Sequence, residues 1–191
     1  MKDIYDLAII GGGAAGLIAA PFAVQLGARV AFIEKDRIGG DCTWTGCVPS
    51  KTLIKSARVA YQMRTASRFG LAPVEAAVNL KPVMEHVRSV IAEIYSHTTP
   101  ETLRNQGIHV FLGEPHFIDA HTISIGDQTL SANYVLICTG AHPFVPPITG
   151  LDTISYLTYQ NIWDLNILPK HLVVIGGGPI GCEIAQGFRR L

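Results

Sequence analysis

Two cysteines and a lysine form the part of this sequence that could most readily do chemistry. Cys42 and Cys47 have four residues between them, and Lys51 follows Cys47 by one helical turn. Positions five apart lie about 140° apart around a regular helix, so the two sulfur atoms could meet only if the backbone folds at Gly46. A disulfide that closes so small a ring is more readily reduced than a structural one. The spacing therefore favours a bond that opens and closes.

Cys47 also stands at the start of a predicted helix. The exposed amides and the dipole of a helix start favour a thiolate, and the Lys51 ammonium lies on the same side. The alternatives are two ordinary buried cysteines or two metal ligands. A metal site needs further Cys or His ligands at short spacing, and the sequence has none nearby. A redox role is therefore the better hypothesis, and no metal site is predicted.

A glycine-rich turn follows the first apolar run of the chain. In Gly11-x-Gly13-x-x-Gly16 the first glycine makes a tight turn, the second lets the backbone approach a pyrophosphate, and the third lets helix and strand pack closely. Such a turn can also be a purely structural link. Glu34, 18 residues beyond Gly16 at the end of the next strand, could accept hydrogen bonds from an adenosine ribose. This context favours a dinucleotide site over a solvated carboxylate at a strand end.

The same turn recurs near the end of the sequence. Gly176, Gly178 and Gly181 repeat the offsets of the first turn and follow another apolar run. A second dinucleotide-binding unit is therefore predicted to begin here. The sequence shows no ribose-binding acid or arginine for it, so the choice between NAD and NADP stays open.

The apolar patterns predict an α/β fold that carries both turns. Strands are expected at residues 7–10, 29–33, 108–111, 117–118, 122–125, 128–130, 134–138 and 172–175, and helices at 14–26, 48–63, 80–95 and 100–107. The fully apolar strands belong to a parallel sheet, and the short strands after residue 107 form a β-meander. Three prolines in residues 142–147 end a first domain, 1–147. Residues 148–191 are a linker and the first βα unit of a second Rossmann-like domain.

Composition limits the classes of function. The chain has 191 residues, of which 48% are hydrophobic, and its 15 basic residues balance 15 acidic ones. A packed core is therefore expected, and neither a nucleic acid nor an anionic membrane is favoured as a partner. The first apolar run is too short for a signal peptide, and no stretch is long enough to span a bilayer. A cytoplasmic protein acting on a small molecule is expected.

The segment Gly39–Lys51, GGDCTWTGCVPSK, resembles the active-site signature of the class I pyridine nucleotide-disulfide oxidoreductases. This family includes dihydrolipoamide dehydrogenase, glutathione reductase and mercuric reductase. The opening glycine turn, Glu34, the strand end Cys138-Thr139-Gly140 and the second glycine turn occur in the family's order, so the resemblance covers the whole chain. It implies that residues 1–147 bind FAD and that the second turn belongs to an NAD or NADP domain.

The resemblance also implies roles for individual residues. Cys47 would be the thiol that faces the flavin, and Cys42 the thiol that attacks the substrate. Lys51 would lie beside the flavin and pair with Glu183, for which the alternative is a first-turn helix acid favoured by the dipole. The implied cofactor-binding residues are Gly11, Gly13, Ala15, Gly16, Glu34, Lys35, Gly40, Asp41, Cys42, Lys51, His116, Thr139, Gly140, Gly176, Gly178 and Gly181.

Two positions depart from the family pattern. Asp41 stands where many members have threonine beside the flavin pyrophosphate, and Trp44-Thr45 replaces the commoner asparagine-valine between the cysteines. The second departure is associated with mercuric-reductase-like proteins and leaves the substrate subclass open. Cys138 and Cys182 match no redox position, and both are interpreted as small core residues.

The implied reaction passes electrons between NAD(P)H and a substrate through FAD and a Cys42–Cys47 disulfide. The substrate would be a small-molecule disulfide, dithiol or metal ion. In this family the general base comes from the C-terminal domain of the other subunit, so the full-length protein is expected to be a homodimer, and this chain alone is expected to bind FAD without turnover. The alternatives are a dinucleotide-binding module with inert cysteines and a flavoenzyme that uses one cysteine without a redox disulfide.

Overall fold

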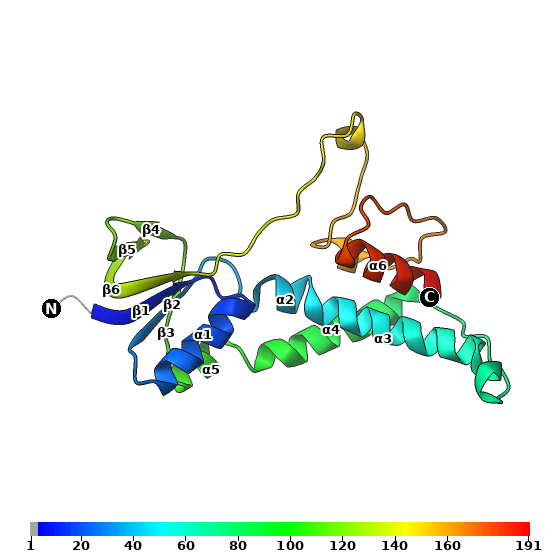
Figure 1. Cartoon of the computed structure of the whole chain (residues 1–191), viewed down its shortest axis with the longest axis horizontal. Coiled ribbons are helices and arrows are strands. Elements are labelled where there is room, and N and C mark those ends of the chain that lie inside the picture. The colour runs from blue at the N-terminus through cyan, green and yellow to red at the C-terminus, as the bar shows by residue number, and fades with distance from the viewer. Residues whose placement is uncertain (1–3) are drawn as a thin grey trace. The chain divides into compact units, whose positions relative to one another are not determined.

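The computed structural model describes residues 4–191, and Figure 1 shows its elements. The chain divides into two compact units. The first comprises Met1–Trp44 and Glu93–His142, and the second comprises Thr45–Ala92 and Pro143–Leu191. The domain boundary predicted after residue 147 stays a prediction.

The first unit is built on a six-stranded sheet of mixed direction. Its strands are β1 (Ile4–Ile10), β2 (Val30–Glu34), β3 (His109–Leu112), β4 (Pro115–Phe117), β5 (Thr122–Ile125) and β6 (Gln128–Ile137). They lie in the order β3-β2-β1-β6-β5-β4. The first four in this order are parallel, and β6-β5-β4 is an antiparallel meander. The predicted parallel sheet with a β-meander is therefore confirmed.

β2 and the last three residues of β1 are buried on both faces, which explains their continuous apolar sequence. Ile9, Val30 and Phe32 point to one face, in a cluster with Ala20 of α1 (Ala14–Gln25) and Leu103 of α5 (Pro100–Asn105). The alternate side chains pack into a second cluster with the meander. Figure 1 shows α1 and α5 on one side of the parallel strands and strands β4 and β5 of the meander on the opposite side. β2 and the end of β1 are thereby held in the core, and the turn that follows β1 has a fixed place.

β6 replaces two predicted strands. The sequence suggested separate strands at 128–130 and 134–138, but one strand runs from Gln128 to Ile137. Its first residues pair antiparallel with β5, and the residues from Ser131 onward pair in parallel with β1. The polar Ser131-Ala132-Asn133 stretch therefore marks a change of partner along one strand, and does not interrupt it.

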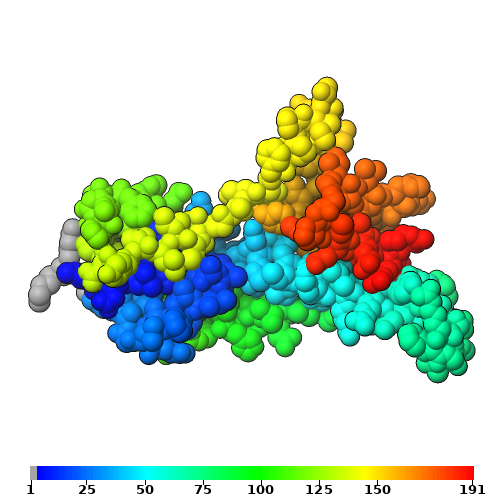
Figure 2. Space-filling view, in the orientation of Figure 1, coloured from blue at the N-terminus to red at the C-terminus, as the bar shows by residue number. Residues whose placement is uncertain are grey.

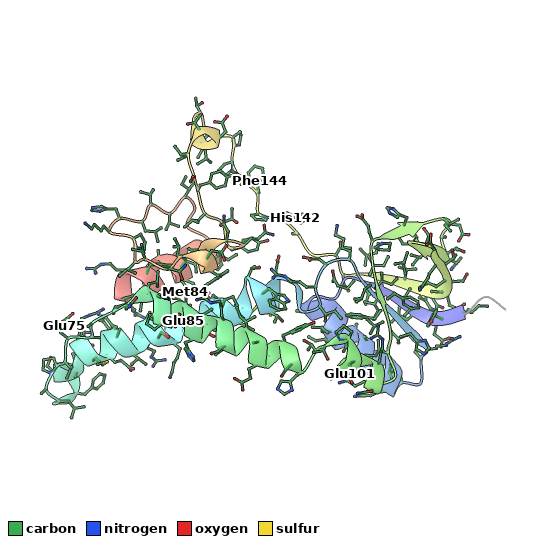
Figure 3. The ribbon with its side chains drawn as sticks, turned by 180° about the vertical axis from the view of Figure 1, so that it is seen from behind. Glu75, Met84, Glu85, Glu101, His142 and Phe144 are labelled. Carbon is green, nitrogen blue, oxygen red and sulfur yellow. The ribbon has the colours of Figure 1, made fainter. Side chains whose placement is uncertain are left out.

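The second unit is mainly helical. Its elements are α3 (Cys47–Arg64), η1 (Ala66–Phe69), the greater part of α4 (Leu80–Ser96), η2 (Leu151–Thr153), η3 (Ile162–Asp164) and α6 (Pro179–Arg190). α3 packs against α6 at Gly187, where a Cβ would lie 3.7 Å from Leu53 Cδ2, an ordinary van der Waals distance. On α4, Met84 is buried while its neighbour Glu85 is exposed (Figure 3). No helix in residues 4–191 is long and apolar enough to cross a membrane.

The strand predicted at residues 172–175 is not formed. These residues have no regular secondary structure, and Val173 and Ile175 are 86% and 61% exposed. In Figure 2 the segment, drawn in orange, lies at the surface next to α6. A strand of a parallel sheet needs hydrogen-bonding neighbours, and within residues 4–191 no strand lies beside residues 172–175. The turn and helix of the predicted βα unit are present, but the strand is not.

Candidate functional site

The first glycine turn leads from the end of β1 into α1, and backbone crowding requires its glycines. Gly11 has a φ of +107°, and a Cβ on it would overlap the carbonyl oxygen of Cys138. A Cβ on Gly16 would overlap the carbonyl oxygen of Gly11, so the third glycine lets the helix close against its own turn. Gly13 is different. Its φ and ψ of −78° and −169° suit any residue, and a Cβ there would lie in open space, 3.9 Å from Gly40 Cα.

The open side of Gly13 is where an anion fits the turn. Gly13 is the N-cap of α1, and no side chain among the described residues caps that end. The first amides of the helix are therefore available to a phosphate. Gly40 closes the other side, because a Cβ on it would lie 2.7 Å from Gly13 Cα. Ala15, in the first turn of α1, is exposed and presents its amide at the same helix end.

Substituting alanine for Gly16 should destabilise the first unit strongly. The new Cβ would meet the Gly11 carbonyl, and neither backbone can yield without opening the turn. Overpacking of this kind typically costs about 1–3 kcal/mol, and we expect a loss at the upper end of that range. Urea unfolding followed by circular dichroism measures it. Gly13→Ala is the matched control, since its Cβ has room, and equal unfolding free energies for the two variants would contradict the prediction.

Glu34 ends β2 and turns its carboxylate back toward the glycine turn. Oε2 accepts a hydrogen bond from the Gly12 amide at 2.6 Å, and Oε1 accepts one from the Asp36 amide at 2.7 Å. The half-buried carboxylate is thus held beside the turn, unlike the freely solvated side chain of the alternative hypothesis. Lys35, the next residue, is exposed and forms an ion pair of 3.6 Å with Glu114.

The cysteine segment contains a short helix that the sequence analysis missed. α2 (Gly40–Trp44) carries Asp41 and Cys42. Helical structure then stops, and Gly46 adopts φ −117° and ψ −103° before α3 begins at Cys47. The backbone therefore bends at Gly46, but Cys42 and Cys47 are not joined in a disulfide, and the bond between them stays a prediction. Asp41 is exposed in the first turn of α2, Cys42 is half-buried, and Cys47 is exposed.

Lys51 forms an ion pair with Glu183, 132 positions away in sequence. Lys51 Nζ donates a hydrogen bond to Glu183 Oε2 at 2.7 Å, which joins α3 to α6. The two side chains are 62% and 42% exposed, so the pair adds little to stability, about 1 kcal/mol or less. Glu183 is the fifth residue of α6, which makes the hypothesis of a first-turn acid wrong. The expected pairing is present, whereas its catalytic role stays a prediction.

The backbone conformation of the second glycine turn matches that of the first. Gly176 has a φ of +109°, close to the +107° of Gly11, and Gly178 is an extended N-cap like Gly13. A Cβ on Gly181 would lie 2.5 Å from the Gly176 carbonyl oxygen, which repeats the crowding between Gly16 and Gly11. The turn therefore has the backbone shape of the first turn although residues 172–175, directly before it, form no strand.

The two remaining cysteines differ in exposure. Cys138 follows β6 and packs against the core cluster under α1, as expected of a small core residue. Cys182 is exposed, and its thiol donates only a 3.4 Å hydrogen bond to the Gly177 carbonyl. The core prediction for Cys182 is therefore wrong, because the sheet that would cover this side of α6 is not formed by the described residues.

Cys138 should be slower to alkylate than Cys182. Burial raises the pKa of the Cys138 thiol above its usual value by desolvation, so less thiolate is present at a given pH. At pH 8 we expect iodoacetamide to label Cys138 several-fold more slowly, with the gap narrowing as the pH rises. Mass spectrometry of timed digests measures both rates. Equal rates at pH 8 would contradict the effect of burial.

The other expected flavin contacts lie in the first unit. Thr139 and Gly140 follow Cys138 after the end of β6 and are exposed. The Cys138 amide donates a 2.7 Å hydrogen bond to the Ile10 carbonyl, next to the glycine turn. His116 is an exposed residue of β4 opposite Ser124 in β5. Within residues 4–191, no group of three or more His, Cys, Asp or Glu side chains is arranged to hold a metal ion.

Sequence analysis missed the two tryptophans that hold the cysteine segment. Trp44 donates a 2.8 Å hydrogen bond to the Ile38 carbonyl, stacks at a tilt on Tyr95 and lies under the Arg37 guanidinium. Trp163 of η3 donates to the Thr45 carbonyl at 2.9 Å. Neither contact could be found from spacing, although Trp44 was noted as a departure from the family pattern.

The fold and the glycine turns define a dinucleotide-binding protein, and known proteins identify it further. The profile of the family described as "Pyridine nucleotide-disulphide oxidoreductase" matches residues 5–191. The mercuric reductase of Lysinibacillus sphaericus is 36% identical over 190 residues, which cover 100% of this chain and 35% of that protein. The dihydrolipoyl dehydrogenase of Acholeplasma laidlawii is 31% identical over 194 residues, covering 98% of this chain and 57% of that protein.

A solved structure is similar over nearly the whole chain. The HOCl-induced flavoprotein disulfide reductase RclA from Escherichia coli superposes with a TM-score of 0.81 at 29% identity, covering 97% of this chain and 40% of that one. This chain therefore belongs to the pyridine nucleotide-disulfide oxidoreductase family, a family of flavin-dependent oxidoreductases. It spans about a third of the mercuric reductase and somewhat more than half of the dihydrolipoyl dehydrogenase.

Proposed function

We propose that this chain supplies the FAD site and the redox thiols of an enzyme that passes electrons between NAD(P)H and a small-molecule substrate. The observation that carries the proposal is the arrangement in the second unit. α3 begins at Cys47, and Lys51, one turn along, is paired with Glu183 on the helix that follows the second glycine turn. A thiol, a cation and a nucleotide-binding turn are thus linked through two packed helices.

The first unit fits the pyrophosphate and ribose of FAD. The open face of Gly13, the uncapped start of α1 and the closely approaching Gly40 form a cradle that a side chain would fill. Glu34 lies beside it with acceptor oxygens for a ribose. When bound, FAD would supply the exchange of a hydride with NAD(P)H and of an electron pair with the disulfide.

Cys47 and Cys42 are proposed to form the redox disulfide. Reduction of the bond would give two thiols, with Cys47 at the amides of the α3 start, where negative charge is favoured. Cys42 would then attack the substrate. The Lys51 ammonium, oriented by Glu183, would stabilise negative charge near the flavin ring.

The substrate class proposed is that of the relatives, a metal ion, a disulfide or a dithiol. Mercuric reductases and dihydrolipoyl dehydrogenases both resemble the chain over 97% or more of its length. Trp44-Thr45 between the cysteines supports the mercuric-reductase-like alternative. A homodimeric whole protein and a cytoplasmic location are further parts of the proposal, as is NAD or NADP as the nicotinamide cofactor.

An anaerobic dithionite titration of the FAD-loaded chain tests this function. A redox disulfide should consume one electron pair per flavin beyond the pair that reduces the flavin itself. The Cys42→Ser variant is the control and should lose the additional pair. If the unmodified chain takes up only the flavin's electron pair, the chain is a binding module or a single-cysteine flavoprotein, and the disulfide mechanism is wrong.

A further inference from the structure

Trp163 makes a buried side-chain contact to the cysteine segment. It lies in η3, where its neighbour Ile162 and its own ring are 6% and 7% exposed. The indole Nε1–H points at two carbonyl oxygens, those of Thr45 at 2.9 Å and of Tyr159 at 2.7 Å. The contact to Thr45 spans 118 positions of sequence and lies entirely within the second unit.

The start of α3 has no hydrogen bond from the side chain of its N-cap residue. The N-cap is Gly46, which has no side chain to accept a hydrogen bond from the first amides. Inside the helix, the Ser50 amide donates to the Gly46 carbonyl at 3.0 Å, and the Ser50 hydroxyl donates to the Cys47 carbonyl at 3.3 Å. Before the helix, Thr45 is 6% exposed, and its carbonyl is held by Trp163.

We infer that Trp163 is a positioning residue for Cys47, because its indole N–H fixes the Thr45 carbonyl and with it the direction of the first amides of α3. The inference rests on the proposed function in taking Cys47 as a redox thiol. Trp163 lies outside the cysteine motif, and the inference adds it to the residues that determine the reactivity of the Cys47 thiol. A thiolate at a helix start is favoured only while the amides point at it.

Loosening this contact should slow the reaction of Cys47 with alkylating reagents. Cys47 is already exposed, so access is not limiting and fraying cannot improve it. What fraying removes is the fixed direction of the first amides of α3, the helix that begins at Cys47. A net hydrogen bond contributes about 1 kcal/mol, which is equivalent to about a fivefold change in a rate or an equilibrium constant.

The experiment measures iodoacetamide labelling of each cysteine at neutral pH in the 191-residue chain and in Trp163→Phe. The phenyl ring keeps an aromatic side chain at this position and removes the N–H donor, with some loss of packing volume. We expect Cys47 labelling to slow about fivefold, with Cys182 unchanged as the internal reference. Trp44→Phe is the matched control, since it removes an equivalent indole hydrogen bond, to Ile38, and should leave Cys47 labelling unchanged.

Two results would overturn the inference. One is a Cys47-to-Cys182 rate ratio in Trp163→Phe within twofold of the unmodified chain. The other is an equal change of all the labelling rates together with a lowered thermal midpoint, which would make Trp163 a structural residue only. If Trp163→Phe does not fold, benzothienylalanine at position 163 keeps the indole shape without the donor and gives the same two readings. Labelling needs neither FAD nor turnover, so failure here is distinct from failure of the dithionite titration.

Discussion

Replacing Gly13 by valine should give a folded protein that does not retain FAD. The backbone at Gly13 is extended, in a region that any residue adopts, and a Cβ there meets only Gly40 Cα at 3.9 Å. The branched side chain would instead occupy the space at the uncapped start of α1 that a pyrophosphate needs. We expect flavin affinity to fall by at least about a hundredfold, equivalent to some 2.7 kcal/mol. Visible absorbance of the purified chain measures flavin content.

The second glycine turn provides the control for this variant. Gly178 has the same extended N-cap conformation as Gly13, and nothing lies within 4 Å of a Cβ placed on it. Gly178→Val should therefore leave flavin content unchanged. A yellow Gly13→Val protein with the flavin content of the unmodified chain would show that the pyrophosphate does not bind at this turn. Loss of flavin in both variants would point to a general folding defect.

Replacing Cys47 by serine should leave FAD bound but remove the long-wavelength absorbance of the reduced, FAD-loaded chain. That absorbance requires a thiolate in contact with the oxidised flavin, and Cys47 is the cysteine at the start of α3. A hydroxyl is not ionised at neutral pH, so the band should vanish completely. Spectra recorded during anaerobic reduction of Cys47→Ser and the unmodified chain give the comparison.

Two further cysteine variants identify which thiol produces the band. Cys182→Ser should retain it, because Cys182 is exposed on α6 and matches no redox position. Cys42→Ser should also retain it, because the proposed flavin-facing thiol is intact. Persistence of the band in Cys47→Ser, or its loss in Cys42→Ser alone, would reverse the assignment of the two thiols.

The parts of the fold that local patterns determine could be predicted from sequence. Gly11, Gly13 and Gly16 placed a turn between β1 and α1, and Thr99 with Pro100 marked the start of α5, where the Thr99 hydroxyl accepts a hydrogen bond from the Thr102 amide. α3 begins at Cys47, one residue before the predicted helix. Each of these features depends on residues within one or two turns of each other.

Features that depend on distant partners could not be predicted. The apolar run at residues 172–175 has the composition of a strand, but a strand exists only beside another strand. α2 was missed because Gly40 opens it and five residues give no readable period. Trp163 contacts Thr45 across 118 positions, and no spacing rule connects them. Lys51 and Glu183, equally distant, were paired only through the resemblance to a family.

The φ angles of the two glycine turns match, although only the first turn follows a paired strand. The loop conformation and the strand before it, which nucleotide-binding folds usually combine, can therefore occur separately. Gly176 has a φ of +109° although residues 172–175 form no strand, while Gly11 has a φ of +107° after β1, a strand paired on both sides. The conformation of the loop is thus determined by its own residues and does not require a paired strand before it. During synthesis, such a loop would be able to bind a phosphate before the strands of its sheet had paired.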